Sequence, residues 1–158
     1  MLDDDKLLEP GLNEVFLYHG TSSDTADVIA EHGFDERVAS LQGLYGAGIY
    51  FANQSCKASQ YCEPKKADPL YLNMGQQKKD VKTLIVARVA LGDPFYTMSS
   101  LSKQRRPPER STRTGWKPGL LYDSVVVNAG DNNQVHRELI LYDHKQAYPE
   151  YIVRFREY

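Results

Sequence analysis

The sequence has few cysteines and no long hydrophobic run. Its two cysteines, Cys56 and Cys62, are six residues apart. Two thiols are too few for a four-cysteine zinc site, and a disulfide between them is allowed but not required. We interpret both as reduced, which is typical of an intracellular protein. No apolar stretch approaches the ~20 residues that a membrane-spanning helix needs. The acidic start at 1–6 also lacks the hydrophobic region of a secretory signal. The sequence therefore predicts an intracellular location and no membrane partner.

The chain also lacks an excess of charge of one sign. Nineteen Lys and Arg residues are set against 21 Asp and Glu residues, which gives a net charge of −2. Proteins that mainly bind polyanions usually carry an overall positive field. Nucleic acid is therefore not favoured as the main ligand. The 158 residues are 41% hydrophobic and 25% charged, which is typical of one folded domain. We expect a lead-in segment at 1–13, interrupted by Pro10-Gly11, and one domain at 14–158.

Hydrophobic runs and turn residues predict an α+β fold. One helix is expected from Ser22 or Ser23 to His32, closed by Gly33, and a shorter one at 54–61. The links between the later strands are too short for parallel crossovers, so we expect mostly antiparallel pairing. The nearly continuous apolar run at 83–91 predicts a strand buried on both faces. The expected strands are 15–18, 49–52, 83–91, 122–127, 138–142 and 151–155.

Glycine is concentrated in one stretch, where Gly43, Gly46 and Gly48 precede Ile49-Tyr50-Phe51-Ala52. A dinucleotide-binding Rossmann loop needs G-x-G-x-x-G after a strand and before a helix. Here the order is G-x-x-G-x-G and the stretch precedes a strand, so that interpretation fails. A P-loop fails as well, because no Gly-Lys-Ser/Thr follows. Taken alone, the stretch is a turn that bends the chain into a strand.

The glycine stretch is one of several motifs that occur in a fixed order. The others are Tyr18-His19-Gly20-Thr21, Gly33-Phe34-Asp35, Lys57 with Tyr61, Leu91-Gly92-Asp93, and Gln146-Ala147-Tyr148-Pro149-Glu150-Tyr151. Over roughly 14–157 this series resembles the catalytic domain of the poly(ADP-ribose) polymerase (PARP) family, the diphtheria-toxin-like ADP-ribosyltransferases with a His-Tyr-Glu signature. The resemblance implies two packed, mostly antiparallel sheets with a few short flanking helices. It also implies NAD⁺ as co-substrate, no metal, and a protein as acceptor.

The resemblance assigns roles to individual residues. His19, Tyr50 and Glu138 correspond to the signature and are the candidate catalytic residues. By the resemblance, His19 holds a hydroxyl of the adenosine ribose, the main chain of Gly20 pairs with the nicotinamide carboxamide, and Tyr50 and Tyr61 enclose the nicotinamide ring. Glu138 would bind the 2′-hydroxyl of the nicotinamide ribose, where a carboxylate stabilises the positive charge that develops as nicotinamide leaves. Further donor-binding candidates are Thr21, Arg37, Tyr45 and Ser59.

One position departs from the family. Eight residues after Tyr50 the family usually has a serine that binds the carboxamide, and this chain has Ala58. The missing hydroxyl weakens that anchor by about 1 kcal/mol, unless Ser59 or Ser55 replaces it.

Three functions follow from the residues of the site, and a fourth, transfer to nucleic-acid ends, rests on the basic segment 103–117 alone. The first is transfer of ADP-ribose to protein side chains, with a single unit or a short chain favoured and polymer formation left open by Glu138. The second is NAD⁺ hydrolysis with water as acceptor, and the third is a catalytically weak module that binds NAD⁺ or ADP-ribose. The basic segment 103–117 is interpreted as a solvated loop, or alternatively as a docking surface for an acidic acceptor, nucleic acid or an ADP-ribose chain.

Overall fold

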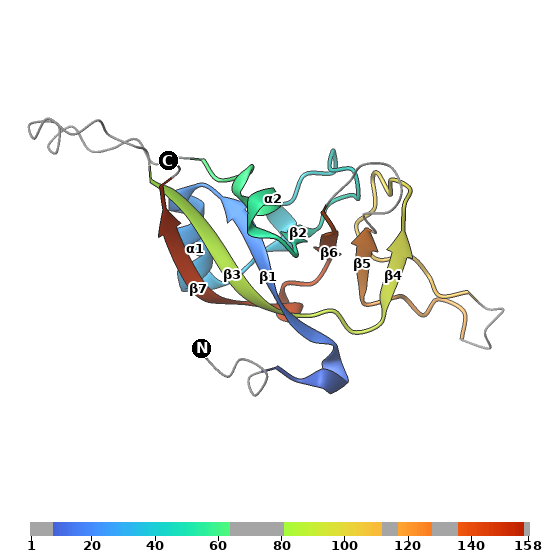
Figure 1. Cartoon of the computed structure of the whole chain (residues 1–158). Coiled ribbons are helices and arrows are strands. Elements are labelled where there is room, and N and C mark those ends of the chain that lie inside the picture. The colour runs from blue at the N-terminus through green and yellow to red at the C-terminus, as the bar shows by residue number, and fades with distance from the viewer. Residues whose placement is uncertain (1–7, 64–80, 112–116, 128–135, 157–158) are drawn as a thin grey trace, which may run out of the picture.

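The structure is a computed structural model of the whole chain, and residues 8–63, 81–111, 117–127 and 136–156 are described (Figure 1). Strands and a few short helices alternate along these segments, which confirms the predicted α+β class. The elements in chain order are η2 (Pro10–Leu12), β1 (Glu14–Thr21), α1 (Ser23–His32), η3 (Glu36–Val38), β2 (Ile49–Ala52), α2 (Ser55–Ser59), β3 (Lys82–Ala90), β4 (Pro94–Thr97), β5 (Ser124–Val127), β6 (Glu138–Leu141), η6 (His144–Gln146) and β7 (Ala147–Phe155).

The described strands form one hydrogen-bonded sheet in the order β4-β5-β6-β2-β1-β3-β7. All neighbours are antiparallel except β4 and β5, which are parallel. In the described residues, the strands of the two packed sheets expected from the resemblance are joined into one sheet. The reason is the pairing of Tyr18 with Ala52, which joins β1 to β2. That junction is short, whereas β1 pairs with β3 along its whole length. The sheet thus has two halves, with β7, β3 and β1 in one and β2, β6, β5 and β4 in the other (Figure 1).

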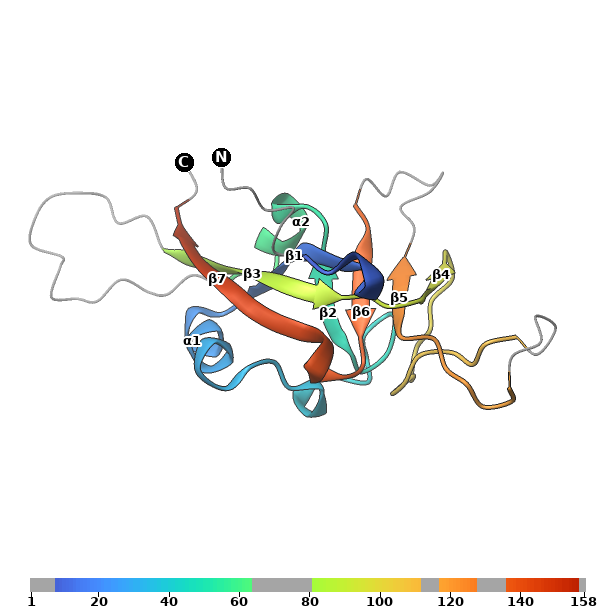
Figure 2. The ribbon, with the colours of Figure 1, turned by 90° about the horizontal axis from the view of Figure 1, so that it is seen from below.

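The main core lies between α1 and the half-sheet of β1, β3 and β7. Alternate residues of β3, Ile85, Ala87 and Val89, are fully buried there beside Ala26 and Ile29 of α1. The opposite face of β3 is buried at Leu84, but Val86 is only partly buried. The expected burial on both faces thus holds only near the start of β3. Figure 2 shows α1 and α2 on opposite sides of the sheet.

Local signals set the ends of α1 as the sequence predicts. The Ser22 side chain accepts a hydrogen bond from the Thr25 N–H at 3.2 Å, which caps the first turn. At the other end, Gly33 has φ +81°, and its N–H donates to the Ile29 carbonyl at 2.8 Å. No helix in the described ranges is long and apolar enough to cross a membrane.

Two strands, β4 and β7, differ from the sequence prediction, and both contain a proline at an edge of the sheet. β4 was not among the expected strands; it begins at Pro94, at an edge of the sheet where a missing N–H is tolerated. The last strand, β7, begins at Ala147 rather than Tyr151 and includes Pro149. It is also an edge strand, and its register with β3 shifts between Val86 and Ala87, which accommodates the proline.

Candidate active site

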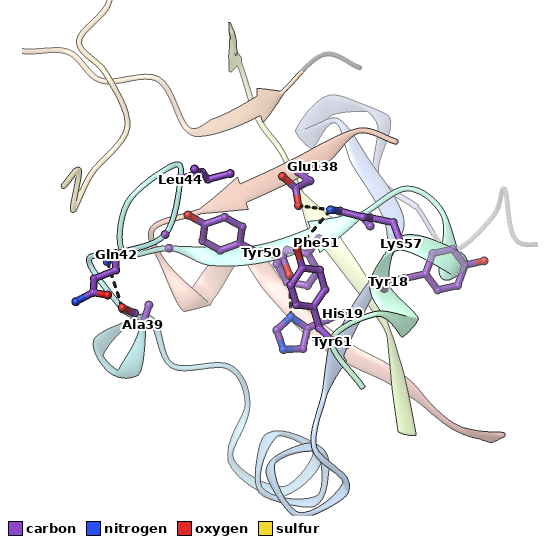
Figure 3. Close-up of a pocket in the computed structure, with 16 residues that line it drawn as sticks. Tyr18, His19, Ala39, Gln42, Leu44, Tyr50, Phe51, Lys57, Tyr61 and Glu138 are labelled. Carbon is purple, nitrogen blue, oxygen red and sulfur yellow. Dashed lines mark hydrogen bonds and ion pairs between the residues drawn. The ribbon is translucent and has the colours of Figure 1, made fainter. Parts of the chain in front are cut away.

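A cavity of about 460 Å³ opens between β1, β2, α2 and the loop before β2. Figure 3 shows its side chains, which come from distant parts of the chain. Five of the residues predicted for the site, His19, Gly20, Tyr50, Tyr61 and Glu138, line this one cavity. Its other lining residues are Tyr18, Ala39, Ser40, Gln42, Gly43, Leu44, Gly48, Phe51, Ala52, Lys57 and Ala58.

Glu138 lies at the start of β6, opposite Ala52 of β2, and faces a lysine from α2. Its Oε1 is 3.3 Å from Nζ of Lys57, and the two side chains are only 17% and 23% exposed. Burial acts to lower the pKa of Lys57, but the Glu138 carboxylate and the Tyr61 hydroxyl outweigh it, so the pKa of Lys57 is raised. Lys57 is therefore charged at neutral pH. Glu138 keeps its second oxygen, Oε2, without a hydrogen bond to any described residue, so that oxygen can accept one from a ligand.

Lys57 belongs to one of the sequence motifs, but no role in the site was predicted for it. Besides Glu138, its Nζ contacts Tyr61, 3.4 Å from the hydroxyl and 5.4 Å from the ring centre. A signal was present, because Lys57 and Tyr61 are four residues apart and therefore share one face of a helical turn. Because Tyr61 was predicted to line the site, this spacing also predicts that Lys57 lies there.

Tyr50 has its hydroxyl engaged by the glycine stretch and its ring turned to the cavity. The hydroxyl accepts a hydrogen bond from the Tyr45 N–H at 3.0 Å and donates one to the Gly46 carbonyl at 2.8 Å. Gly43 makes room for this arrangement, since a Cβ there would lie 2.3 Å from the Tyr50 oxygen. The ring remains available as one wall of the cavity, and Tyr61, which is 57% exposed, is another (Figure 3).

His19 belongs to β1, which extends beyond the strand expected at 15–18. Its Nδ1 is 2.8 Å from the Tyr50 carbonyl oxygen, and its ring packs against Phe34 and Phe51. A carbonyl can only accept, so Nδ1 donates this bond. Burial lowers the pKa of His19, and the bond to Tyr50 opposes this only in part. The imidazole is therefore neutral at neutral pH, and its Nε2 is an acceptor for a hydroxyl group.

Gly20 is the point of closest approach between β1 and α2. A Cβ at this position would lie 1.8 Å from the Ala58 carbonyl oxygen, so only glycine fits. Ala58 itself is buried, with 3% of its surface exposed, and lines the cavity. Its neighbour Ser59 is not among the cavity-lining residues, and its hydroxyl donates to the Cys56 carbonyl at 3.0 Å. The structure thus gives Ser59 an intrahelical bond, and its contact with a donor stays a prediction.

A second cavity, of about 630 Å³, adjoins the first. Both are lined by His19, Ala39, Gly48 and Tyr50, so the two cavities meet at these residues. Thr21 and Arg37, two further predicted donor-binding residues, line only the second cavity. The Arg37 guanidinium makes two bonds to the Asp35 carboxylate, at 2.8 and 2.7 Å. These bonds hold the pKa of Asp35 at about 2.

Tyr45 lines neither cavity. It is 5% exposed and packs in a small core with Val125, Val127 and Ile140. Its carbonyl accepts a hydrogen bond from the Tyr142 hydroxyl, so its visible contacts support the glycine stretch from behind. A direct contact of Tyr45 with a ligand stays a prediction. Within the described part of the chain, no three His, Cys, Asp or Glu side chains gather in a way that could hold a metal ion.

The sheet and the cavity together define an α+β protein with a ligand cavity that has aromatic walls and one carboxylate. Comparison with known proteins identifies its family. The family model of the poly(ADP-ribose) polymerase catalytic domain matches residues 4–157. The chain belongs to this family.

Relatives with curated names agree with this assignment. The chain is 31% identical over 157 residues to the human protein mono-ADP-ribosyltransferase PARP11, in a match that covers 92% of this chain and 42% of the relative. It is 30% identical over 145 residues to human protein mono-ADP-ribosyltransferase PARP12, covering 91% and 17%. Chicken poly [ADP-ribose] polymerase 1 is 23% identical over 164 residues, covering 91% and 15%. The chain therefore spans less than half the length of each of these relatives.

Proposed function

We propose that this chain is an NAD⁺-dependent ADP-ribosyltransferase that transfers ADP-ribose to a protein side chain, one unit at a time. The observation that carries the proposal is the arrangement of Glu138 and Lys57 between the two tyrosine walls of one cavity. The membership of the PARP catalytic-domain family supports the reaction class. The names of the relatives PARP11 and PARP12, both mono-ADP-ribosyltransferases, support single transfer.

The two adjoining cavities match the two ends of a dinucleotide. The first has aromatic walls and a carboxylate, which suit a cationic nicotinamide ring and its ribose. The second carries Thr21 and Arg37, and neutral His19 lies on the boundary between the two. In that position Nε2 of His19 is able to accept a hydrogen bond from the adenosine ribose.

Chemically, the bond between the ribose C1′ and the nicotinamide nitrogen breaks, and its electron pair leaves with nicotinamide. The nucleophile of the acceptor then bonds to C1′ and loses its proton. Positive charge develops on the ribose in the transition state, so a carboxylate bound to the 2′-hydroxyl stabilises it. Lys57 holds Oε1 of Glu138 and leaves Oε2 for the hydroxyl. Lys57 thus orients the carboxylate rather than reacting itself.

The experiment uses NAD⁺ labelled in its adenylate half, with and without acceptor proteins. Free nicotinamide and attached label are both measured. Attached label in the acceptor supports transfer, and bands of one unit rather than a ladder support single transfer. Nicotinamide release without attached label would instead identify an NAD⁺ glycohydrolase. Absence of both products, in a protein that still binds NAD⁺, would identify a binding module and overturn the proposal.

The matched variants are Glu138→Gln and Glu63→Gln. Gln at position 138 keeps the size of the side chain but removes its charge, so we expect turnover to fall by about 10²- to 10³-fold. Glu63 is exposed and lines neither cavity, and the same substitution there should leave turnover unchanged. Equal activity of the two variants would show that Glu138 is not the catalytic carboxylate.

A further inference from the structure

We propose that Lys103 and Arg105, held beside the mouth of the first cavity, form a docking surface for an acidic segment of the acceptor protein. We call Lys103, Gln104 and Arg105 the basic rim. The inference rests on the proposed function, because it identifies what kind of acceptor that cavity serves. The sequence alone favoured a solvated loop for this segment, and the backbone contacts described next are the reason for a different conclusion.

The basic rim is fastened to the glycine stretch by its backbone. The Leu101 N–H donates to the Leu44 carbonyl at 2.9 Å, and the Ala47 N–H donates to the Gln104 carbonyl at 2.8 Å. Gly46 allows the closest contact, since a Cβ there would lie 2.3 Å from the Gln104 oxygen. The segment 101–104, which leads into the rim, is therefore attached at two points to the glycine stretch.

Leu44 marks where this loop meets solvent. It lines the first cavity and is also 64% exposed, so it lies at the cavity mouth, on the side of Tyr50 and Glu138 (Figure 3). The residues on either side of Gln104, which bonds to Ala47, are Lys103 and Arg105. Lys103 and Arg105 therefore flank the residue that is bonded to the glycine stretch, the loop that supplies Leu44 to the cavity mouth.

The backbone at Lys103 is left-handed, with φ +67°. A non-glycine residue adopts this conformation at a cost and only where its surroundings hold it. Here the reversal lies directly before Gln104, the residue whose carbonyl bonds to Ala47. The left-handed turn and the bond to Ala47 therefore belong to one rigid connection rather than to a freely solvated loop.

Within the described part of the chain, no neighbour neutralises the charges of the basic rim. Arg110 is bonded to Asp93 and Asp123, and Arg106 lies 3.3 Å from Glu109. Lys103 and Arg105 are exposed, and neither has an ion pair with any described residue. Free cations beside a reaction site attract acidic groups and steer them toward it.

An acidic polypeptide fits this surface better than a nucleic acid. The chain as a whole carries a net charge of −2, and the rim offers two exposed cations, fewer than the series of cations that tracks a nucleic-acid backbone. Leu44 adds an apolar contact at the same mouth, which suits a peptide side chain. A carboxylate-rich segment would also bring Asp and Glu side chains to the cavity as nucleophiles.

The test compares the double variant Lys103→Glu and Arg105→Glu with a control double variant, Lys145→Glu and Arg156→Glu. The control makes the same charge change at two exposed positions, one on η6 and one directly after β7. The acceptors are a Glu- and Leu-containing peptide, its Gln counterpart, and a single-stranded oligonucleotide.

We expect KM for the acidic peptide to rise by about three- to tenfold in the rim variant, since exposed charge pairs contribute only modestly. Nicotinamide release without peptide, which needs only the cavity, should not change. Lys103→Arg/Arg105→Lys should restore wild-type KM.

Several outcomes would overturn the proposal. These are an unchanged KM for the acidic peptide, an equal loss in the control variant, or a loss confined to the oligonucleotide. Direct binding of the fluorescently labelled acidic peptide, measured without NAD⁺, separates this inference from the proposed function. If wild type has no transferase activity, weaker peptide binding by the rim variant alone still supports the docking surface. Equal binding by the wild type and both variants rejects it.

Discussion

At the scale of single residues, the pair of Lys57 and Glu138 is the contact on which the proposed chemistry depends most. Neither residue shows this role by itself, because a lysine in a short helix and a glutamate opening a strand are usually solvated charges. The pair is different because both side chains are mostly buried and the atoms lie 3.3 Å apart. A partly buried ion pair with a defined geometry fixes the direction of the free carboxylate oxygen.

Lys57→Met should therefore reduce kcat more than it raises KM for NAD⁺. A hydrogen bond to a charged group contributes about 1.5–3 kcal/mol, so we expect kcat to fall by about 10- to 100-fold. Lys57→Arg should retain part of the activity, because the charge is kept. Steady-state kinetics of nicotinamide release measure both constants, with Lys145→Met on the exposed surface as control. If Lys57→Met changed KM alone, Lys57 would be a binding residue rather than the one that orients Glu138.

The protonation of His19 makes a second prediction at this scale. Burial lowers the pKa of His19 below its ordinary value of 6.5, so the unfolded chain binds this proton more readily than the folded one. Stability should therefore be fully present above pH 6.5 and decrease as the pH falls from there toward the lowered pKa. Urea unfolding at pH 7.5 and pH 5.5 should show a larger loss of stability in the wild type than in His19→Gln. An equal loss in both proteins would contradict a buried neutral His19.

At the scale of elements, the contact between β1 and α2 positions the catalytic helix. Gly20 of β1 touches the Ala58 carbonyl of α2, and the same helix carries Lys57 and precedes Tyr61. The helix has only five residues, so it depends on this packing rather than on its own hydrogen bonds.

Gly20→Ala should displace α2 and with it the ammonium of Lys57. Overpacking of this kind costs about 1–3 kcal/mol of stability, and turnover should fall as well because the Lys57–Glu138 distance increases. Thermal unfolding and nicotinamide release check the two effects. Gly11→Ala is the matched control, since the nearest atom to its Cβ, at 3.2 Å, is the end of the flexible Glu9 side chain. Full activity of Gly20→Ala would show that α2 can shift without harm.

Elements with strong local signals were predictable, and those that depend on their place in the sheet were not. Ser22 and Gly33 set the ends of α1 through caps that the sequence displays. Pro94 begins one edge strand and Pro149 lies inside the other, although proline normally argues against a strand. Whether a strand lies at an edge is decided by its neighbours in the sheet, which local sequence does not show.

At the scale of the whole molecule, the site crosses the junction between the two halves of the sheet. His19 and Gly20 belong to β1 in one half, whereas Tyr50 and Glu138 belong to β2 and β6 in the other. The halves are joined at the pairing of Tyr18 with Ala52. A ligand that contacts both sides should therefore strengthen the junction.

A non-hydrolysable NAD⁺ analogue should slow amide hydrogen exchange at this junction more than in the rest of the sheet. At 100 times its Kd, a ligand that binds only the folded state stabilises it by about 2.7 kcal/mol. Part of that free energy should appear at Tyr18, Ala52 and their neighbours, while the long β1–β3 ladder changes less. Exchange measured by NMR or mass spectrometry checks this. Slowing confined to β3 and β7 would place the ligand elsewhere.

The sequence by itself determined the α+β class, the ends of α1 and the set of motifs that carries the family resemblance, including His19, Tyr50 and Glu138. These follow from patterns within short stretches, where spacing and residue type act directly. Only the tertiary structure decided that the sheet is continuous, that Lys57 faces Glu138, that Tyr45 and Ser59 are engaged away from the cavity, and that the basic rim is attached to the glycine stretch. Each of these depends on contacts between residues far apart in the chain, and such contacts are selected by the packing of the whole fold rather than by local sequence.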